Sequence, residues 1–315
     1  MHIEQQERWP NFFIVGAPRC GTTSLYSYLK EVPGVYMPRV KEPFYFSPNL
    51  VQVWRHPPQG MVTDKEQYLG LFKNAKGYIA VGEASPSYLW DPDSPKLIHE
   101  AVPHARIIIL LRDPIDRAYS HYLLDMKTWA PARRSSFADH LTRGGISQLE
   151  VQFGMYYEQV KRYLEIFGTE QVKVIIFEEF IQHLEQTVSE VLSFLGVGYT
   201  VAVMRLKEDN AYSVPRSPLS LWVYAFFRWL RARGINTSRI RILVGDSAIL
   251  VLERSLLKGA EKPKIEPKAV EFLREVYYDD VIRLQSLLAR SLPWCTVLGH
   301  EKNNKNMKQR FDDFS

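Results

Sequence analysis

The chain has 315 residues, of which 46% are hydrophobic and 24% charged, with a formal net charge of +5. This composition excludes a predominantly disordered chain, and the modest positive charge favours an anionic ligand over nucleic acid. The two cysteines, Cys20 and Cys295, predict neither a disulfide framework nor a metal site. From the polar first ten residues and the lack of a long apolar run, we expect no signal peptide, no membrane span and a cytoplasmic protein.

The predicted elements alternate between short apolar runs and amphipathic segments. Phe12 to Gly16 is a buried strand that ends in a turn, and an apolar face at helical spacing follows from Thr22. A second strand is expected at Tyr78 to Val81, and RIIILL at Arg106 to Leu111 is the strongest strand signal. The later elements are expected over residues 118–126, 155–167, 172–177, 188–195 and 267–290. This alternation predicts a three-layer α/β/α fold around a central parallel sheet.

We expect one domain over residues 1–300, with an insert or lid around 215–260 and a polar tail at 301–315. The segment 219–233, LSLWVYAFFRWLRAR, is aromatic, apolar and basic. Four interpretations of it stay open: a packed helix of the domain, a lid over a substrate, a dimer surface, or a helix lying on a membrane.

The turn after the first strand has the G-x4-G frame of a phosphate-binding loop, from Gly16 to Gly21. Backbone N–H groups of such a loop and the start of the following helix bind anions. A nucleoside-triphosphate loop has a lysine after its second glycine, but Thr22 stands there and the cation is Arg19, inside the loop. The predicted anion-binding residues are Arg19, Cys20, Gly21, Thr22, Thr23 and Ser24. Two alternatives remain: a tight turn without a ligand, and a Cys20 thiol that is a nucleophile rather than a small buried side chain.

A second anion site is predicted at the carboxyl end of the RIIILL strand. Arg112 follows that strand, and Ser120 lies about two helical turns later, so both can converge on one anion. Asp113 is a suitable N-cap for the intervening helix, and Arg117 is a reserve cation. The alternative is an ion pair between Arg112 and Asp113, with Ser120 facing the core.

The segments GAPRCGTTSLYSYL and LLRDPIDRAYSHYL together resemble the donor-binding motifs of sulfotransferases that use 3′-phosphoadenosine 5′-phosphosulfate (PAPS). The resemblance is strongest to the branch with bacterial enzymes and heparan sulfate sulfotransferases. It continues through KEPFYF, GEASPSYL, GMYYEQVKRYLEIFG and NAYSVPRS, and so covers most of residues 10–295. It implies a P-loop NTPase-like sulfotransferase fold, a 5′-phosphosulfate held by the first loop, and a 3′-phosphate held by Arg112 and Ser120.

The resemblance also points to Glu42, in KEPFYF, as the general base. Aromatic neighbours are expected to desolvate this carboxylate and raise its pKa; the alternative is that Glu42 pairs with Lys41. His121 is compared with the histidine base of phenol-type relatives, but an ordinary helix histidine is favoured.

Two departures from the family pattern concern charge. Many relatives have lysine where this chain has Arg19, and many have Glu-Lys-Ser/Thr-Pro where it has Glu83-Ala84-Ser85-Pro86. The second departure removes a cation that could touch the sulfate or the acceptor.

The resulting hypothesis is in-line sulfuryl transfer from PAPS to a hydroxyl or amine, with Glu42 activating the acceptor and Arg19 stabilising the leaving side. A carbohydrate acceptor is expected first, and a lipid or secondary metabolite next. No metal and no nucleic acid are expected. The rival hypotheses are a P-loop kinase or NTPase and a non-catalytic nucleotide-binding module.

Overall fold

The computed structural model describes residues 8–53, 60–129, 136–145, 148–198, 213–215, 257–259 and 262–299. The segment 219–233 and the tail at 301–315 lie outside the described residues, and so does most of the expected insert. The expectations for those segments therefore stay predictions.

A five-stranded parallel sheet forms the centre of the molecule, in the order β2-β3-β1-β4-β5. Its strands are β1 (Phe12–Gly16), β2 (Val35–Tyr36), β3 (Ala80–Ala84), β4 (Arg106–Leu111) and β5 (Val172–Ile176). A separate antiparallel pair joins β6 (Ser213–Pro215) to β7 (Leu257–Gly259). Both faces of the central strands are covered, which is why β1 and β4 read as continuous apolar runs.

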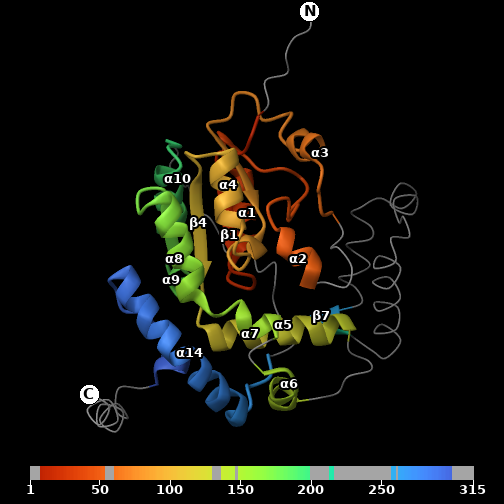
Figure 1. Ribbon diagram of the computed structural model, residues 1–315, viewed down its shortest axis with the longest axis vertical. Helices are drawn as coiled ribbons and strands as arrows, with labels where there is room; N and C mark the ends of the chain where they lie inside the picture. The colour runs from red at the N-terminus through yellow and green to blue at the C-terminus, as the bar shows by residue number, and fades with distance from the viewer. Residues whose placement is uncertain are drawn as a thin grey trace, which may run out of the picture.

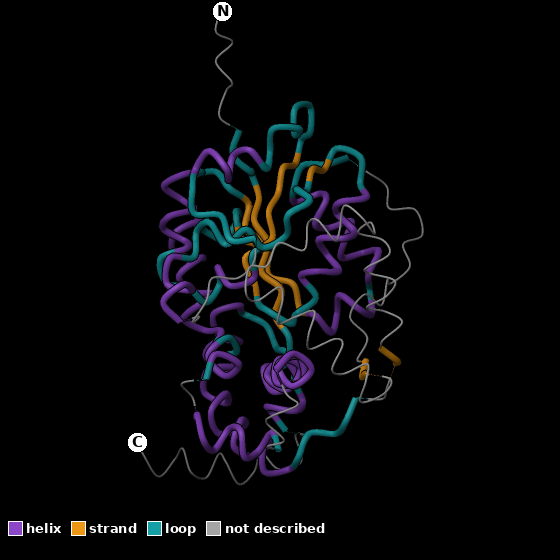
Figure 2. The backbone as a smooth tube through the Cα atoms, turned by 90° about the vertical axis from the view of Figure 1, so that its right-hand side faces the viewer, coloured by secondary structure: helices purple, strands orange, loops and turns teal. Residues whose placement is uncertain are grey.

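Two pairs of helices pack along the sheet. One pair is α1 (Thr22–Glu31) with α10 (Leu184–Phe194), and the other is α4 (Ser94–Ala101) with α8 (Tyr156–Phe167). Helices flank the strands on both sides (Figure 2). The predicted three-layer α/β/α fold is confirmed.

A group of helices lies beyond the carboxyl ends of the strands. Two residues separate the end of β4 from the start of helix α5, which runs across the end of the sheet (Figure 1). The long helix α14 packs against α8, α5, α6 and α15. The helices of this group are α5 (Pro114–Trp129), α6 (Phe137–Gly144), α7 (Leu149–Gln152), α14 (Pro267–Leu288) and α15 (Cys295–Leu298). Shorter elements are α2 (Pro48–Val53), α3 (Lys65–Gly70), η1 (Pro86–Tyr88) and α9 (Phe177–Gln182).

The boundaries of one strand differ from the prediction in a way that matters for the site. The strand expected at Tyr78 to Val81 begins at Ala80 and continues through Glu83 to Ala84. Glu83 lies two residues beyond the end of the expected strand, yet it is buried inside the sheet. Strand β2 is too short to be visible as a pattern.

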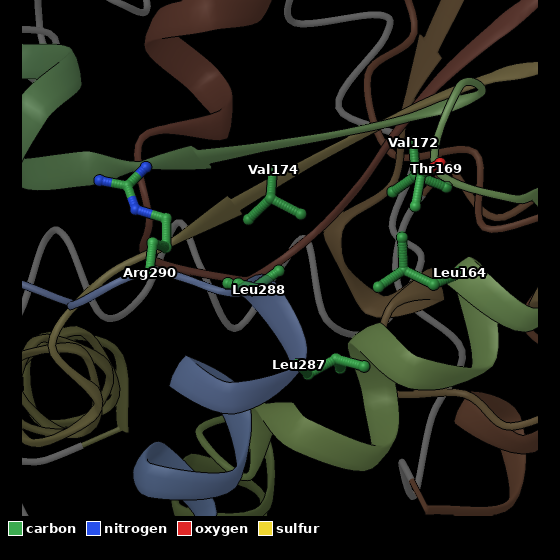
Figure 3. Close-up of a pocket in the computed structure, with 7 residues that line it drawn as sticks. All are labelled: Leu164, Thr169, Val172, Val174, Leu287, Leu288 and Arg290. Atoms are coloured by element: carbon green, nitrogen blue, oxygen red, sulfur yellow. The ribbon is translucent and has the colours of Figure 1, made fainter.

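A cavity of about 260 Å³ lies between edge strand β5 and helices α8 and α14 (Figure 3). Its lining is Leu164, Thr169, Val172, Val174, Leu287, Leu288 and Arg290. None of the predicted site residues lines it, so the site must be built from other contacts. Among the described residues, no helix has both the length and the apolar character needed to cross a bilayer.

Candidate active site

The loop between β1 and α1 depends on both glycines of the predicted frame. A Cβ added at Gly16 would lie 2.4 Å from the Leu89 Cβ, so the turn after β1 can approach η1 only without a side chain. Gly21 has φ +87°, and a Cβ there would lie 2.9 Å from the Phe177 ring. The strand, glycine-bounded loop and helix of the prediction are therefore confirmed.

The start of α1 is left open to an anion. Gly21 caps the helix without a side-chain hydrogen bond, and no acidic residue occupies the first turn. The first N–H groups of a helix have no partner within it and point along the positive end of its dipole. The hydroxyls of Thr23 and Ser24 are partly exposed beside them, whereas Thr22 is buried.

Arg19 connects the two predicted motifs. Its backbone has φ +72°, and its Nε donates a hydrogen bond of 3.1 Å to the Ser120 Oγ on α5. The sequence assigned Ser120 to the Arg112 site, and the structure shows that its hydroxyl also contacts Arg19, which lies near Arg112. The loop after β1 and the helix after β4 therefore contribute to one site rather than to two separate ones.

Three cations gather at this edge of the sheet. Burial lowers the pKa of Arg19, and the charge of Arg112 lowers it further. Burial also lowers the pKa of Lys262, followed by the charges of Arg112 and Arg19. No carboxylate in the described part of the chain lies within ion-pair distance of any of the three. Such a cluster of mutually repelling cations, two of them desolvated, favours a multiply charged anion.

Aromatic rings support two of these cations. The Arg112 guanidinium carbon lies 4.7 Å from the centre of the Phe177 ring, and the Lys262 Nζ lies 5.0 Å from that of Tyr119. Sequence analysis missed Lys262, which precedes Pro263 just after the expected insert and belongs to no recognisable motif.

Cys20 is a structural residue of the loop. Its thiol is buried, 3.6 Å from the Tyr156 Oη, and burial raises its pKa to about 11. Its backbone N–H donates to the Ala17 carbonyl at 3.2 Å. Its thiol and its N–H are both engaged inside the protein, and ligand binding by Cys20 stays a prediction. The alternative of a small buried side chain is confirmed.

Asp113 caps α5 as predicted. Its Oδ1 accepts the Ile115 N–H at 3.0 Å, and the predicted alternative of an ion pair with Arg112 is not formed. Its own N–H donates to the Glu178 carboxylate at 3.1 Å, which also accepts the indole N–H of Trp294. These bonds fix the end of β4, and with it the backbone that presents Arg112.

Arg117 and His121 form part of a buried cluster behind the site. The Arg117 side chain is fully buried and donates to the Glu150 carbonyl, so the prediction of a reserve cation for the ligand is wrong. His121 stacks on Phe153 with ring centres 5.7 Å apart. Burial, and then the charge of Arg117, lowers the pKa of His121 to about 3. His121 is a neutral helix histidine, as favoured from the sequence.

Glu42 lies at the same sheet edge as the phosphate loop. Its backbone N–H donates to the Ala84 carbonyl at 3.1 Å, at the end of β3. Ala84 pairs in register with Ile14 of β1, two residues before Gly16. The sheet therefore brings together the predicted base and the predicted anion loop, which the sequence separates by the whole of α1 and β2.

The surroundings of the Glu42 carboxylate differ from the prediction. The side chain is 38% exposed and pairs with the Lys41 ammonium. The aromatic rings of Phe44 and Phe46 turn into the core instead of enclosing it. The expected desolvation by these rings is wrong, and the alternative pairing with Lys41 is confirmed. Among the described residues, no group of three or more His, Cys, Asp or Glu side chains is placed to hold a metal ion.

Known proteins resemble this chain in sequence and in fold. The family model for the sulfotransferase domain matches residues 10–213. The chain belongs to the sulfotransferase family. A crystal structure of a sulfotransferase from Alicyclobacillus acidocaldarius is 30% identical, with a TM-score of 0.65 over 90% of this chain and 98% of that one.

Curated relatives are more distant. Human carbohydrate sulfotransferase 15 is 25% identical over 67% of this chain and 47% of its own length. Mouse bifunctional heparan sulfate N-deacetylase/N-sulfotransferase 4 is 28% identical over 60% of this chain and 22% of its own length. The chain thus spans about half, or less, of the length of these relatives.

Proposed function

We propose that this sulfotransferase takes its sulfuryl group from PAPS and transfers it to a carbohydrate hydroxyl. The observation that supports this most strongly is the cation cluster of Arg19, Arg112 and Lys262 beside the start of α1. Within the described residues these cations have no carboxylate at ion-pair distance, and no side chain caps the helix. PAPS carries anionic groups on both sides of one adenosine, and a cluster that joins two motifs fits such a donor.

Each part of the site then has a role in holding the donor. Arg19, Thr23, Ser24 and the first N–H groups of α1 hold the phosphosulfate, because they surround the helix start. Arg112 and Lys262 hold the 3′-phosphate. Ser120, which accepts a hydrogen bond from Arg19, links the residues of the phosphosulfate site to those of the 3′-phosphate site. Cys20 is left out of this set.

The reaction forms one bond and breaks one bond at sulfur. The acceptor oxygen bonds to the sulfur as the bond from sulfur to the bridging phosphate oxygen breaks, and the electron pair leaves with adenosine 3′,5′-bisphosphate. Glu42 takes the proton of the acceptor hydroxyl, and the neighbouring Lys41 holds that carboxylate before the acceptor arrives. Arg19 and the helix start stabilise the charge that develops on the leaving oxygen.

The choice of acceptor rests on the names of relatives. One is a carbohydrate sulfotransferase and another is a heparan sulfate N-sulfotransferase, so a sugar hydroxyl is the first acceptor and a sugar amine the second.

The donor is tested by thermal unfolding. Adenosine 3′,5′-bisphosphate should raise the melting temperature of the full chain, and ATP with magnesium should raise it less. The reverse order would favour a kinase or NTPase and overturn the proposal.

Transfer is tested with ³⁵S-labelled PAPS and four acceptors: unsulfated chondroitin, N-deacetylated heparosan, a p-nitrophenyl glycoside and a long-chain alcohol. Glu42→Gln should lower turnover by about 10²–10⁴-fold with unchanged binding of adenosine 3′,5′-bisphosphate. Glu100→Gln, at an exposed carboxylate on α4, is the matched control. Wild-type turnover in Glu42→Gln would remove Glu42 from the mechanism. Bisphosphate binding without transfer to any acceptor would favour a non-catalytic module.

A further inference from the structure

Glu83 is a carboxylate buried in the central sheet without a cationic partner. Its side chain is 1% exposed, and no ion pair in the described part of the chain involves it. Three hydroxyls donate to it instead: Ser85 Oγ to Oε1 at 2.5 Å, and Tyr68 Oη and Tyr88 Oη to Oε2 at 2.6 and 3.1 Å. A buried carboxylate is costly unless it is well hydrogen-bonded, so this arrangement calls for an explanation.

Two of these hydroxyls also contact the loop that contains Glu42. The Phe44 N–H donates to the Ser85 Oγ at 3.2 Å, and the Phe46 N–H donates to the Tyr88 Oη at 3.2 Å. A hydroxyl has a single proton, and in both residues it points to Glu83. The lone pairs of the two hydroxyl oxygens therefore face the two loop amides. Because each hydroxyl donates its proton to Glu83, its oxygen is held in the orientation that accepts from the loop.

The loop needs such support because its backbone is strained. Glu42 has φ +62° and Phe44 has φ +55°, in the left-handed region that residues with a Cβ avoid. Such a conformation is unfavourable and persists only where the surrounding contacts determine it. Both strained residues belong to the segment that the two hydrogen-bond chains hold in place.

We propose that Glu83 is a positioning residue for Glu42, acting through Ser85 and Tyr88 to hold the strained loop in the conformation that presents the base. Glu83 takes no part in the chemistry, because it is buried and both of its oxygens are occupied. The inference rests on the proposed role of Glu42 as base, but the part that concerns the loop can be tested without it.

Replacing Glu83 by glutamine reverses the donor and acceptor roles in one of the two hydrogen-bond chains. The amide keeps the size of the carboxyl but offers one oxygen and one NH₂ group, so one set of hydroxyl protons loses its acceptor. Small displacements of a catalytic group reduce rates strongly, and about 1 Å can cost about 10²-fold. Because burial raises the pKa of Glu83 to about 7, the comparison is made at pH 8, where the carboxylate is ionised. There we expect Glu83→Gln to lower kcat at least tenfold, while the Kd of adenosine 3′,5′-bisphosphate changes less than twofold.

The loop is tested directly by amide hydrogen exchange of the full chain, resolved to single residues. Glu83→Gln should speed exchange at both Phe44 and Phe46. Ser85→Ala should do so at Phe44, and Tyr88→Phe at Phe46, since each cuts one chain. The single-chain variants keep Glu83 and two of its donors, so they allow the test if Glu83→Gln does not fold.

Ser87→Ala is the matched control for this region. Ser87 is buried in the same turn, but its hydroxyl meets the Ser47 hydroxyl at 3.1 Å and not Glu83. It should leave both the exchange of the loop amides and kcat near the wild-type values. If Ser87→Ala speeds loop exchange as much as Ser85→Ala does, the effect is general packing and the inference is overturned.

Kinetic measurements then separate the inference from the proposed function. The kcat is measured for transfer from ³⁵S-labelled PAPS to unsulfated chondroitin or to N-deacetylated heparosan, whichever of the two is sulfated. Glu83→Gln should have little further effect on kcat in a Glu42→Gln background, because its effect passes through Glu42. Unchanged loop exchange in Glu83→Gln, or faster exchange with wild-type kcat, overturns the positioning role. Wild-type kcat in Glu42→Gln overturns the proposed base instead, whatever the exchange shows.

Discussion

Replacing Arg112 by glutamine should weaken donor binding while leaving the stability of the free protein nearly unchanged. A hydrogen bond to a charged group contributes about 1.5–3 kcal/mol, so the Kd of adenosine 3′,5′-bisphosphate should rise by about 10- to 150-fold. In the free protein, the substitution removes a contact with the Phe177 ring that contributes about 0.5–1 kcal/mol. It also removes a charge that repels Arg19 and Lys262. These two effects oppose each other, so the free energy of unfolding should change by less than about 1 kcal/mol.

Calorimetric titration measures the Kd, and urea unfolding without ligand measures stability. Arg106→Gln is the control, because Arg106 is exposed at the opposite end of the same strand. In this variant, neither the free energy of binding nor the free energy of unfolding should change by more than about 0.5 kcal/mol. The reasoning fails if Arg112→Gln leaves the Kd unchanged, or if it destabilises the free protein by several kcal/mol. The second result would mean that Arg112 is a structural cation rather than part of an anion site.

Four further predictions concern other parts of the molecule. Lys262→Met should raise the Kd of adenosine 3′,5′-bisphosphate about tenfold. Because the pKa of Lys262 is lowered, its contribution to binding in the wild type should disappear at a lower alkaline pH than for a free lysine, and titrations from pH 7 to 10 check both expectations. Gly21→Ala should lower the free energy of unfolding by about 1–3 kcal/mol in urea, because φ there is +87°. In the folded chain, iodoacetamide should label the exposed Cys295 and leave Cys20 unmodified, as peptide mass spectrometry would show. Burial raises the pKa of Glu83 from 4.5 to about 7. The stability of the wild type relative to Glu83→Gln should therefore be greatest below pH 4.5 and fall as the pH rises through 7. Urea unfolding of both proteins should show that this relative stability differs by up to about 3 kcal/mol between pH 4.5 and pH 8.

The part of the site that is local in sequence could be predicted. Gly16, Arg19 and Gly21 lie between a strand and a helix that contact each other directly, so a short segment determines both the loop and the start of α1. Arg112 follows a strand whose apolar run can be recognised without its neighbours. In both cases the chemistry of the residue and its place on the sheet edge come from the same few positions.

The rest depends on contacts between distant segments. The sequence does not show that Ser120 turns to Arg19, since that depends on how α5 crosses the end of the sheet. Lys262 reaches the cluster from beyond β7, and no periodic pattern marks it. The strand expected at Tyr78 to Val81 stopped short of Glu83, and the hydroxyl partner Tyr68 of this carboxylate comes from helix α3, which the sequence did not connect with the strand.

The charges of the site are divided along the sheet edge. The ends of β1 and β4 lead into the cations Arg19 and Arg112, and Glu42, in the loop after β2, is hydrogen-bonded to the end of β3. In sulfuryl transfer, negative charge grows on the leaving oxygen while the acceptor oxygen gives up a proton. A positive side for the leaving group and a negative side for the attacking group stabilise both changes at once. The family lysine that is Ala84 here would add a positive charge to the carboxylate side. Without it, the pairing with Lys41 and the backbone of the loop are what position Glu42 in the described residues, and the proposed role of Glu83 concerns that backbone.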